Sequence, residues 1–323
     1  TISGFAGSAT LGSDYSLPSN TITFPANTAT SINYTFPITD DALVEQPENI
    51  VLRLTNPSIG VTYVNEFDTI NITDNDLPYY LINQINHTDP VNGIADSLNV
   101  RCELHGVIYG PNVRPGGLQF FINDRTGGIQ VLRTAGTFGY VPAEGDSIVV
   151  KGDITQAAGQ LQITNLDTVY KISSGNALKT PTVITSYSEA NEGNYVTLQY
   201  CHLVNPAAWP TGAGNAAIAV VDQNNKQFMT QIFRQTDIDS TQPTQYWFHV
   251  SGILAQNDNS LPWDTSYYLI PLHLSNYEIV YPRMSFATAT DTASENIGLD
   301  SMDVNLQWAP RTATSATVSF TGG

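Results

Sequence analysis

The chain has 323 residues, of which 41% are apolar and 13% charged, so it is long enough for two or three domains with cores of their own. Its 29 acidic and 12 basic side chains give a formal net charge of −17. A surface with that excess of acid repels polyanions, which argues against nucleic acid as the main partner. No apolar run approaches the length of a membrane span, and two cysteines, Cys102 and Cys201, are too few for a disulfide framework.

Apolar and polar residues alternate along most of the chain, which is the pattern of β-strands, and helical periodicity is nearly absent. The sequence therefore predicts an all-β protein. In the first segment the predicted strands lie at residues 21–24, 31–36, 49–54 and 69–73. Proline-containing breaks follow residues 76, 179 and 281, and they divide the chain into four expected domains or pieces. These are residues 1–76, 77–179, 180–282 and 283–323.

The first segment has the strongest charge imbalance, with nine acids against the single base Arg53. Most of these acids stand beside predicted strand ends, so they can converge at one tip of a domain. Hard cations such as Ca²⁺ prefer six to eight oxygen ligands from carboxylates and carbonyls. The charge pattern alone allows two interpretations, a calcium site or a solvated acidic rim. The acids concerned are Asp14, Asp40, Asp41, Glu45, Glu48, Asp74 and Asp76.

The order of motifs in this segment resembles the Calx-β domain. Residues Gly7–Tyr15, Gly-Ser-Ala-Thr-Leu-Gly-Ser-Asp-Tyr, are similar to the Gly-Thr-Ala-x-x-Gly-x-Asp-Tyr signature of that family, and Ile38–Asp41 and Ile70–Asp76 follow in the expected order. The resemblance implies an immunoglobulin-like sandwich of about seven strands. It also implies that the seven acids named above are candidate Ca²⁺ ligands at one end of the sandwich.

The expected Calx-β domain has a gap, because the first segment lacks the two opening strands and the acid between them. Similar pieces occur in the tail, where Met284–Ala287 and Val304–Trp308 resemble those opening strands. Glu295 corresponds to the family's first acidic ligand, and Thr317–Ser319 resembles Thr1–Ser3. We therefore expect the two pieces to complete a sandwich within one chain, between neighbouring copies, or between adjacent repeats of a longer array.

The two middle segments show one pattern twice. A hairpin at residues 118–132 is followed by the strand Ile148–Gly152, and a hairpin at 217–232 is followed by Phe248–Gly252. The glycine in each later strand permits the tight coiling that a small barrel needs. Both copies resemble the OB-like domains of Bacteroidota surface proteins, which implies two OB-like β-barrels between the Calx-β pieces.

OB-like barrels of many families bind oligosaccharides or oligonucleotides with aromatic side chains on one face. Most aromatic residues of the two barrels would serve equally well as core or loop anchors. The candidate platforms are Phe121, Trp209, Trp247, Trp263, Tyr267 and Tyr268. The first barrel has four arginines for an anionic ligand, Arg101, Arg114, Arg125 and Arg133.

Patterns typical of enzymes are missing from the sequence. The five histidines form no metal-binding spacing, and neither a Gly-x-Ser-x-Gly elbow nor a phosphate loop occurs. Cys201 and His202 are neighbours on a predicted strand, so they face opposite sides. We expect a secreted, calcium-binding structural or adhesive unit of a bacterial surface protein or extracellular filament, and not an enzyme. The alternative is a module that binds surface glycans or nucleic acid through its OB-like barrels.

Overall fold

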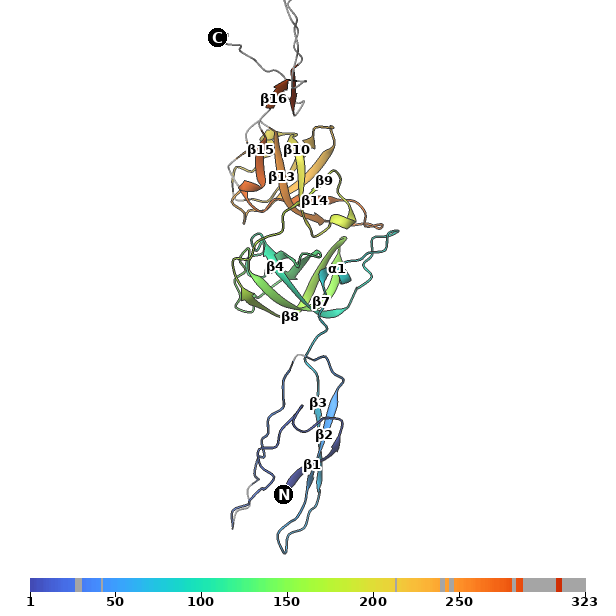
Figure 1. Cartoon of the computed structure of the whole chain (residues 1–323), viewed down its shortest axis with the longest axis vertical. Coiled ribbons are helices and arrows are strands. Elements are labelled where there is room, and N and C mark those ends of the chain that lie inside the picture. Colours follow the sequence, from blue (N-terminus) through green and yellow to red (C-terminus); the bar gives the residue numbers. More distant parts are fainter. Residues whose placement is uncertain are drawn as a thin grey trace, which may run out of the picture. The chain divides into compact units, whose positions relative to one another are not determined.

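The computed structural model describes residues 1–26, 31–41, 43–212, 214–238, 242–243 and 247–280, together with the backbones of two strands at 283–286 and 306–309. The chain divides into two compact units, Thr1–Pro78 (unit 1) and Tyr79–Gly323 (unit 2). Strands dominate both units (Figure 1). Among the described residues the only α-helix is α1 (Ile82–Ile85), so the prediction of an all-β protein is confirmed.

Unit 1 contains one antiparallel sheet of three strands, β1 (Ile2–Gly7), β2 (Glu48–Leu54) and β3 (Phe67–Ile72), in the order β1-β2-β3. Alternate residues of β2 face inward, so Ile50 and Leu52 are buried. They pack with Ile2 and Tyr15 in a small core of this unit.

The predicted strands at 21–24 and 31–36 are extended but belong to no sheet in the described part of unit 1. Their alternation still has an effect, because Ile22, Tyr34 and Phe36 pack against the core formed by β1 and β2. Residues 32–36 make no backbone hydrogen bond to another described residue. A strand requires a neighbouring strand for its N–H and C=O groups, and none is adjacent here, so the prediction of two further strands is wrong for the described residues.

Unit 2 contains a closed barrel, here called barrel 1, in the order β4-β5-β6-β8-β7. Its strands are β4 (Arg101–Tyr109), β5 (Leu118–Asn123), β6 (Gly128–Arg133), β7 (Ser147–Ala157) and β8 (Gln160–Ser173). Strands β6 and β8 pair in parallel and the other pairs are antiparallel. Phe120, Leu104 and Ile148 are among the apolar side chains that fill its interior.

The second half of unit 2 repeats this arrangement in a ring called barrel 2. Its strands β10 (Tyr195–Leu203), β11 (Ala216–Asp222), β12 (Gln227–Ile232), β14 (Tyr267–Ile270) and β13 (Trp247–Gln256) follow each other in that order, and a β10–β13 pairing closes the ring. Strands β12 and β14 are parallel, like β6 and β8. The flanking strands β9 (Thr182–Ile184) and β15 (Tyr277–Val280) extend the sheet, and the 3₁₀ turns η1 (Glu189–Asn191), η2 (Pro206–Ala208) and η3 (Leu274–Asn276) connect it.

The glycines predicted to permit strand coiling occupy matching positions in the two barrels. Gly152 lies in β7 opposite Cys102 of β4, and Gly252 lies in β13 opposite Val196 of β10. A Cβ atom on Gly152 would lie 2.5 Å from the carbonyl oxygen of Thr164, and one on Gly252 would lie 2.4 Å from that of Ile270. Both positions therefore exclude a side chain.

Barrels 1 and 2 share an apolar interface inside unit 2. Tyr109 and Phe121 of barrel 1 form one cluster with Ile253, Ile270 and Leu272 of barrel 2. The rings of Tyr109 and Tyr195 meet edge to face with centroids 5.6 Å apart. The interface therefore buries side chains of both barrels.

Two further strands, β16 (Arg283–Phe286) and β17 (Leu306–Ala309), form a separate antiparallel pair in which Met284 lies opposite Trp308. They overlap the two tail segments that resemble the Calx-β opening. Glu295 and Thr317–Ser319 lie outside the described residues.

Candidate metal centre

Three of the predicted ligands converge in unit 1. One carboxylate oxygen from each of Asp14, Glu45 and Glu48 lies within 4.8 Å of the other two. Glu48 is the first residue of β2, and Glu45 stands in the segment that leads into it. Asp14 is fixed in a turn, where its side chain accepts a hydrogen bond from the backbone N–H of Thr10. Glu45 and Glu48 are near neighbours in sequence, whereas Asp14 is distant from both, so the fold of the unit brings Asp14 to the other two.

Further acids lie around these three residues, here called the acidic cluster. The side chain of Asp74 accepts hydrogen bonds from the backbone N–H groups of Glu45, at 2.7 Å, and of Asp76, at 2.9 Å. Asp41 accepts a bond from the N–H of Leu43 at 2.8 Å. These bonds fix the segment around Glu45 against the end of β3 and hold additional carboxylates beside the cluster.

Asp40 is placed differently from the three converging acids. Asp40 accepts a bond from the side-chain amide of Asn75 at 3.3 Å and is not one of the three converging residues. Glu295 lies outside the described residues. The structure thus assembles Asp14, Glu45 and Glu48, with Asp41, Asp74 and Asp76 near enough to act on Glu45 electrostatically.

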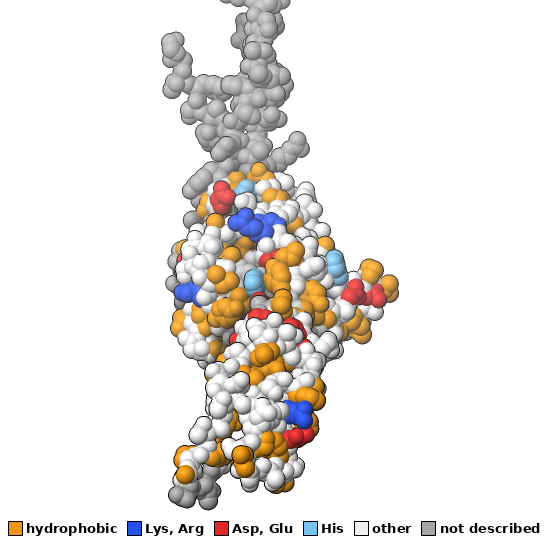
Figure 2. Space-filling view, turned by 60° about the horizontal axis from the view of Figure 1, so that its bottom comes forward, with side chains coloured by type: hydrophobic (Ala, Val, Ile, Leu, Met, Phe, Trp, Pro, Cys, Tyr) orange, Lys and Arg blue, Asp and Glu red, His pale blue; other side chains and the backbone are white. Residues whose placement is uncertain are grey.

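The charged groups that act on Glu45 and Glu48 within the described part of the chain are all carboxylates. Desolvation and the negative charges of Asp41 and Asp14 raise the pKa of Glu45. Desolvation, the charges of Asp14 and Glu45, and a hydrogen bond with Asp14 raise the pKa of Glu48. Arg53, the one base in residues 1–76, instead lies against the neighbouring rings of Phe5 and Phe67, with its Cζ atom 5.1 and 5.3 Å from their centroids. Figure 2 shows how few Lys and Arg side chains the viewed face carries.

The geometry fits a calcium ion. Ca²⁺ binds oxygen at about 2.3–2.6 Å, so two ligands of one ion lie at most roughly 5 Å apart. The limit of 4.8 Å between the three carboxylate oxygens satisfies that requirement. Bidentate carboxylates, backbone carbonyls and water could complete the usual six to eight ligands. A cation would also remove the repulsion that raises the pKa values of Glu45 and Glu48.

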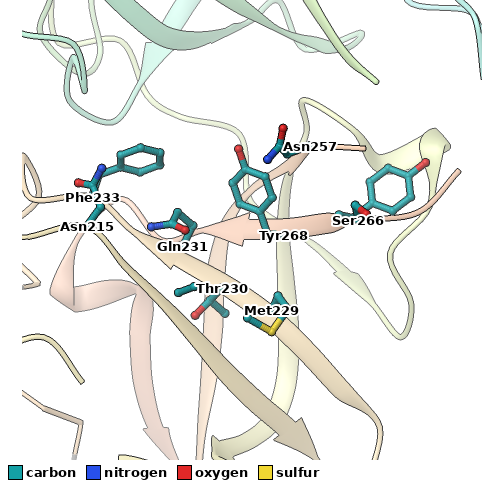
Figure 3. A pocket seen from close by; sticks show the side chains of 10 residues that line it. Asn215, Met229, Thr230, Gln231, Phe233, Asn257, Ser266 and Tyr268 are labelled. Carbon is teal, nitrogen blue, oxygen red and sulfur yellow. The ribbon is translucent and has the colours of Figure 1, made fainter. Parts of the chain in front are cut away.

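Barrel 2 has a groove of about 590 Å³ on its outer surface. Figure 3 shows Tyr268 standing between Gln231 and Asn257, with Phe233 at the side. The only ionisable side chains among the described lining residues are those of two tyrosines. The lining residues are Asn215, Ala217, Met229, Thr230, Gln231, Phe233, Asn257, Ser266, Tyr267 and Tyr268.

Several polar groups of this groove remain available to a ligand. The side chain of Asn257 and the hydroxyl of Tyr268 make no hydrogen bond to another described residue. Asn215 and Gln231 are only partly used, because Asn215 accepts one bond from the N–H of Arg234 and Gln231 donates one to the carbonyl of Ile232. The groove combines aromatic faces with uncharged donors and acceptors.

Sequence analysis identified Tyr267 and Tyr268 but missed the other lining residues. Ala217, Met229 and Gln231 occupy alternate, outward positions of β11 and β12, which is the signal that could have indicated them. Two other candidate platforms serve the interior instead, since Phe121 and Trp209 are each 5% exposed. The ring of Trp247 packs on His202 with centroids 4.5 Å apart.

Two of the four arginines of barrel 1 have structural partners. Arg101 forms ion pairs with Asp153 at 3.0 Å and with Asp167 at 2.5 Å, which takes it out of any basic patch. The guanidinium of Arg133 lies 4.0 Å from the ring centroid of Phe138. Cys201 is fully buried, and burial raises its pKa to about 12.

No protein-family model matches the chain, and no curated protein matches it either. Within the described residues, no helix has the length and apolar character needed to cross a membrane.

Proposed function

We propose that unit 1 is a calcium-binding module and that the chain is a structural or adhesive unit of a modular extracellular protein. The observation that carries this proposal is the convergence of Asp14, Glu45 and Glu48 within 4.8 Å. The Calx-β motifs around Asp14, Asp40 and Asp74 support it, because they assign ligand roles to the same acids. In this proposal Ca²⁺ joins the turn after β1 to the start of β2 and so stiffens one tip of the module.

Calcium binding is tested by titration calorimetry with CaCl₂ on the full chain after EGTA treatment and dialysis. We expect binding that Asp14→Asn weakens at least tenfold. Asp68→Asn is the matched control, since Asp68 is an exposed acid of β3 outside the cluster, and it should bind like the unchanged chain. Absence of heat at millimolar calcium, or equal affinity in the Asp14 variant, would remove calcium from the proposal.

The strand arrangement supports a role in assembly as well. Residues 32–36 make no backbone hydrogen bond to another described residue, and β16 and β17 form a pair that no other described strand joins. Unpaired edges recruit further strands, and a two-stranded hairpin alone is only marginally stable. We propose that neighbouring copies or adjacent repeats supply the missing pairing. Sedimentation over a hundredfold range of concentration should show self-association, and a constant monomer mass would contradict pairing between separate copies.

A second candidate function is recognition of neutral glycans by the groove of barrel 2. The strand order of both barrels, with its parallel third pairing, supports the OB-like resemblance. Tyr268 and Phe233 offer aromatic faces, while Asn257, Gln231 and Asn215 offer planar amides. The described lining residues carry no charged side chain, which favours uncharged, hydroxyl-rich ligands over nucleic acid.

Glycan binding is tested by NMR titration with neutral hexasaccharides, for example cellohexaose and mannohexaose, beside an anionic oligothymidylate. We expect the neutral sugars to change the chemical shifts of residues in β11, β12 and β14. The variants Asn257→Ala and Tyr268→Ala should reduce these changes. Tyr170→Ala is the control, because Tyr170 is an exposed tyrosine on β8 of barrel 1. Shifts with the oligothymidylate alone, or none with any sugar at 10 mM, would exclude this function.

A further inference from the structure

The side chain of Glu192, in barrel 2, is hydrogen-bonded to strand β8 of barrel 1. The residue follows the turn η1 and is only 8% exposed. Its Oε1 atom accepts two hydrogen bonds from β8 of barrel 1, from the backbone N–H of Leu161 at 2.8 Å and from the side-chain amide of Gln160 at 2.8 Å. One carboxyl oxygen therefore connects the two barrels.

The backbone around Glu192 is packed closely across this junction, defined here as residues 158–161 and 128 of barrel 1 with 192–193 and 256–258 of barrel 2. A Cβ atom on Gly128 would lie 1.9 Å from the carbonyl oxygen of Gly193, so only glycine fits there. The backbone N–H of Gln256 donates to the side chain of Gln160 at 3.1 Å, and that of Asp258 donates to the carbonyl of Ala158 at 2.7 Å. Such packing leaves little room for water beside the carboxyl group.

The second oxygen of Glu192, Oε2, is buried and has no hydrogen-bond partner among the described residues. The charged or titratable groups that act on the carboxyl are Glu189 of the same turn and Tyr267 and Tyr268 of β14, and none of these is a cation. Burial raises the pKa of Glu192 to about 8, the charge of Glu189 adds to the increase, and the N–H of Leu161 opposes it. An ionised carboxylate at this place would be a buried and uncompensated charge.

We propose that Glu192 is a proton-dependent lock between barrels 1 and 2, which holds the junction closed as a neutral acid and releases it on ionisation. The geometry supports this role because the same carboxyl makes the hydrogen bonds across the junction and lacks a partner for its second oxygen. A second polar contact joins the two barrels, because Nε2 of His273 of barrel 2 lies 3.0 Å from Oε2 of Glu144 of barrel 1.

The sign of the effect follows from linkage. In the closed junction Glu192 keeps its proton up to about pH 8, whereas in an opened junction it meets water and titrates near its ordinary value of 4.5. Between these two values opening releases one proton, so the equilibrium constant for opening increases up to tenfold per pH unit. Below and above this pH window, the effect of Glu192 on the equilibrium constant for opening does not change with pH. Mildly acid conditions therefore stiffen the connection, and neutral to alkaline conditions loosen it.

Hydrogen exchange of the full chain between pH 5 and 9, in EGTA and corrected for the intrinsic rate, tests the lock separately from calcium binding. The reporters are the amides of Leu161, Gln256 and Asp258, which donate across the junction. Val150 and Val220, in the strands β7 and β11, are internal references. We expect protection of the reporters to fall by about one order of magnitude per pH unit up to pH 8 and then level off, while the references change little.

Two matched variants complete the experiment. Glu192→Gln keeps an oxygen that can accept both bonds but cannot ionise, so it should abolish most of the slope. Glu189→Gln, three residues earlier in the chain, should retain it. If Glu192→Gln does not fold, the ¹³C shift of the Glu192 carboxyl in the unchanged chain reports its titration directly. Titration near pH 4.5, a flat exchange profile, or an unchanged slope in Glu192→Gln would overturn the proposal.

Discussion

The matching glycines of the two barrels give the most direct test of the duplicated architecture. A Cβ atom on Gly152 would lie 2.5 Å from the carbonyl oxygen of Thr164 and 2.9 Å from Cδ2 of Leu166. On Gly252 the corresponding distances are 2.4 Å to the carbonyl oxygen and 2.7 Å to the carbonyl carbon of Ile270. The nearest atoms belong to backbone, so neither strand can give way by a rotamer change alone.

Overpacking a core usually costs about 1–3 kcal/mol, and contact with backbone places Gly152→Ala and Gly252→Ala near the upper end, at about 3 kcal/mol. For a unit of this size each kcal/mol lowers the melting temperature by about 2–4 °C, so each variant should melt about 6–12 °C lower. Because the two positions are equivalent in strand order, we expect decreases of similar size.

Differential scanning calorimetry of the full chain measures these decreases. Gly212→Ala is the control, since no atom lies within 4 Å of a Cβ atom at that position, and it should leave the midpoint within about 1 °C, as is usual for surface changes. Midpoints of both barrel variants within 1 °C of the unchanged chain would refute the steric argument. A decrease in only one variant would refute the equivalence of the two barrels.

Three further results are expected. In EGTA, Glu48→Gln should melt at or above the unchanged chain because it removes like-charge repulsion, whereas in calcium it should melt lower; the same order in both media would contradict a metal role for Glu48. Burial would raise the pKa of Asp146, but hydrogen bonds from Ser174 and Tyr140 and the charge of Lys171 outweigh it and lower the pKa. The ionised Asp146 carboxylate therefore stabilises the fold at neutral pH, and this stabilisation is lost as pH falls through the lowered pKa. Thermal melts should show that Asp146→Asn destabilises the chain at pH 7 but much less at pH 3. Burial raises the pKa of Cys102 and Cys201 to about 12, so neither should react with a thiol reagent at pH 8 until guanidinium unfolds the chain, and rapid labelling of the native chain would show that the barrels open.

The sequence by itself determined the class of structure and much of the strand placement. Alternation of apolar residues located β2, β5, β6, β11, β12 and the start of β13, because inward and outward positions of a strand differ in chemistry at every second residue. The sequence also indicated that Gly152 and Gly252 permit tight strand coiling, because the lack of a side chain at a position can be read directly from the sequence. The acids of unit 1 could be grouped from the sequence, because residues beside strand ends, such as Asp14 and Glu48, can converge at one tip of a domain.

Tertiary structure decided what depends on neighbours distant in sequence. Residues 31–36 have the alternation of a strand, but no described strand pairs with them, and pattern alone does not specify a hydrogen-bonding partner. The groove of barrel 2 combines Asn215, Gln231 and Asn257 from separate elements. Glu192 looks like an ordinary surface acid in sequence, and only the tertiary structure buries it against barrel 1, where burial raises its pKa, because the cost of a charge depends on the solvent and partners around it.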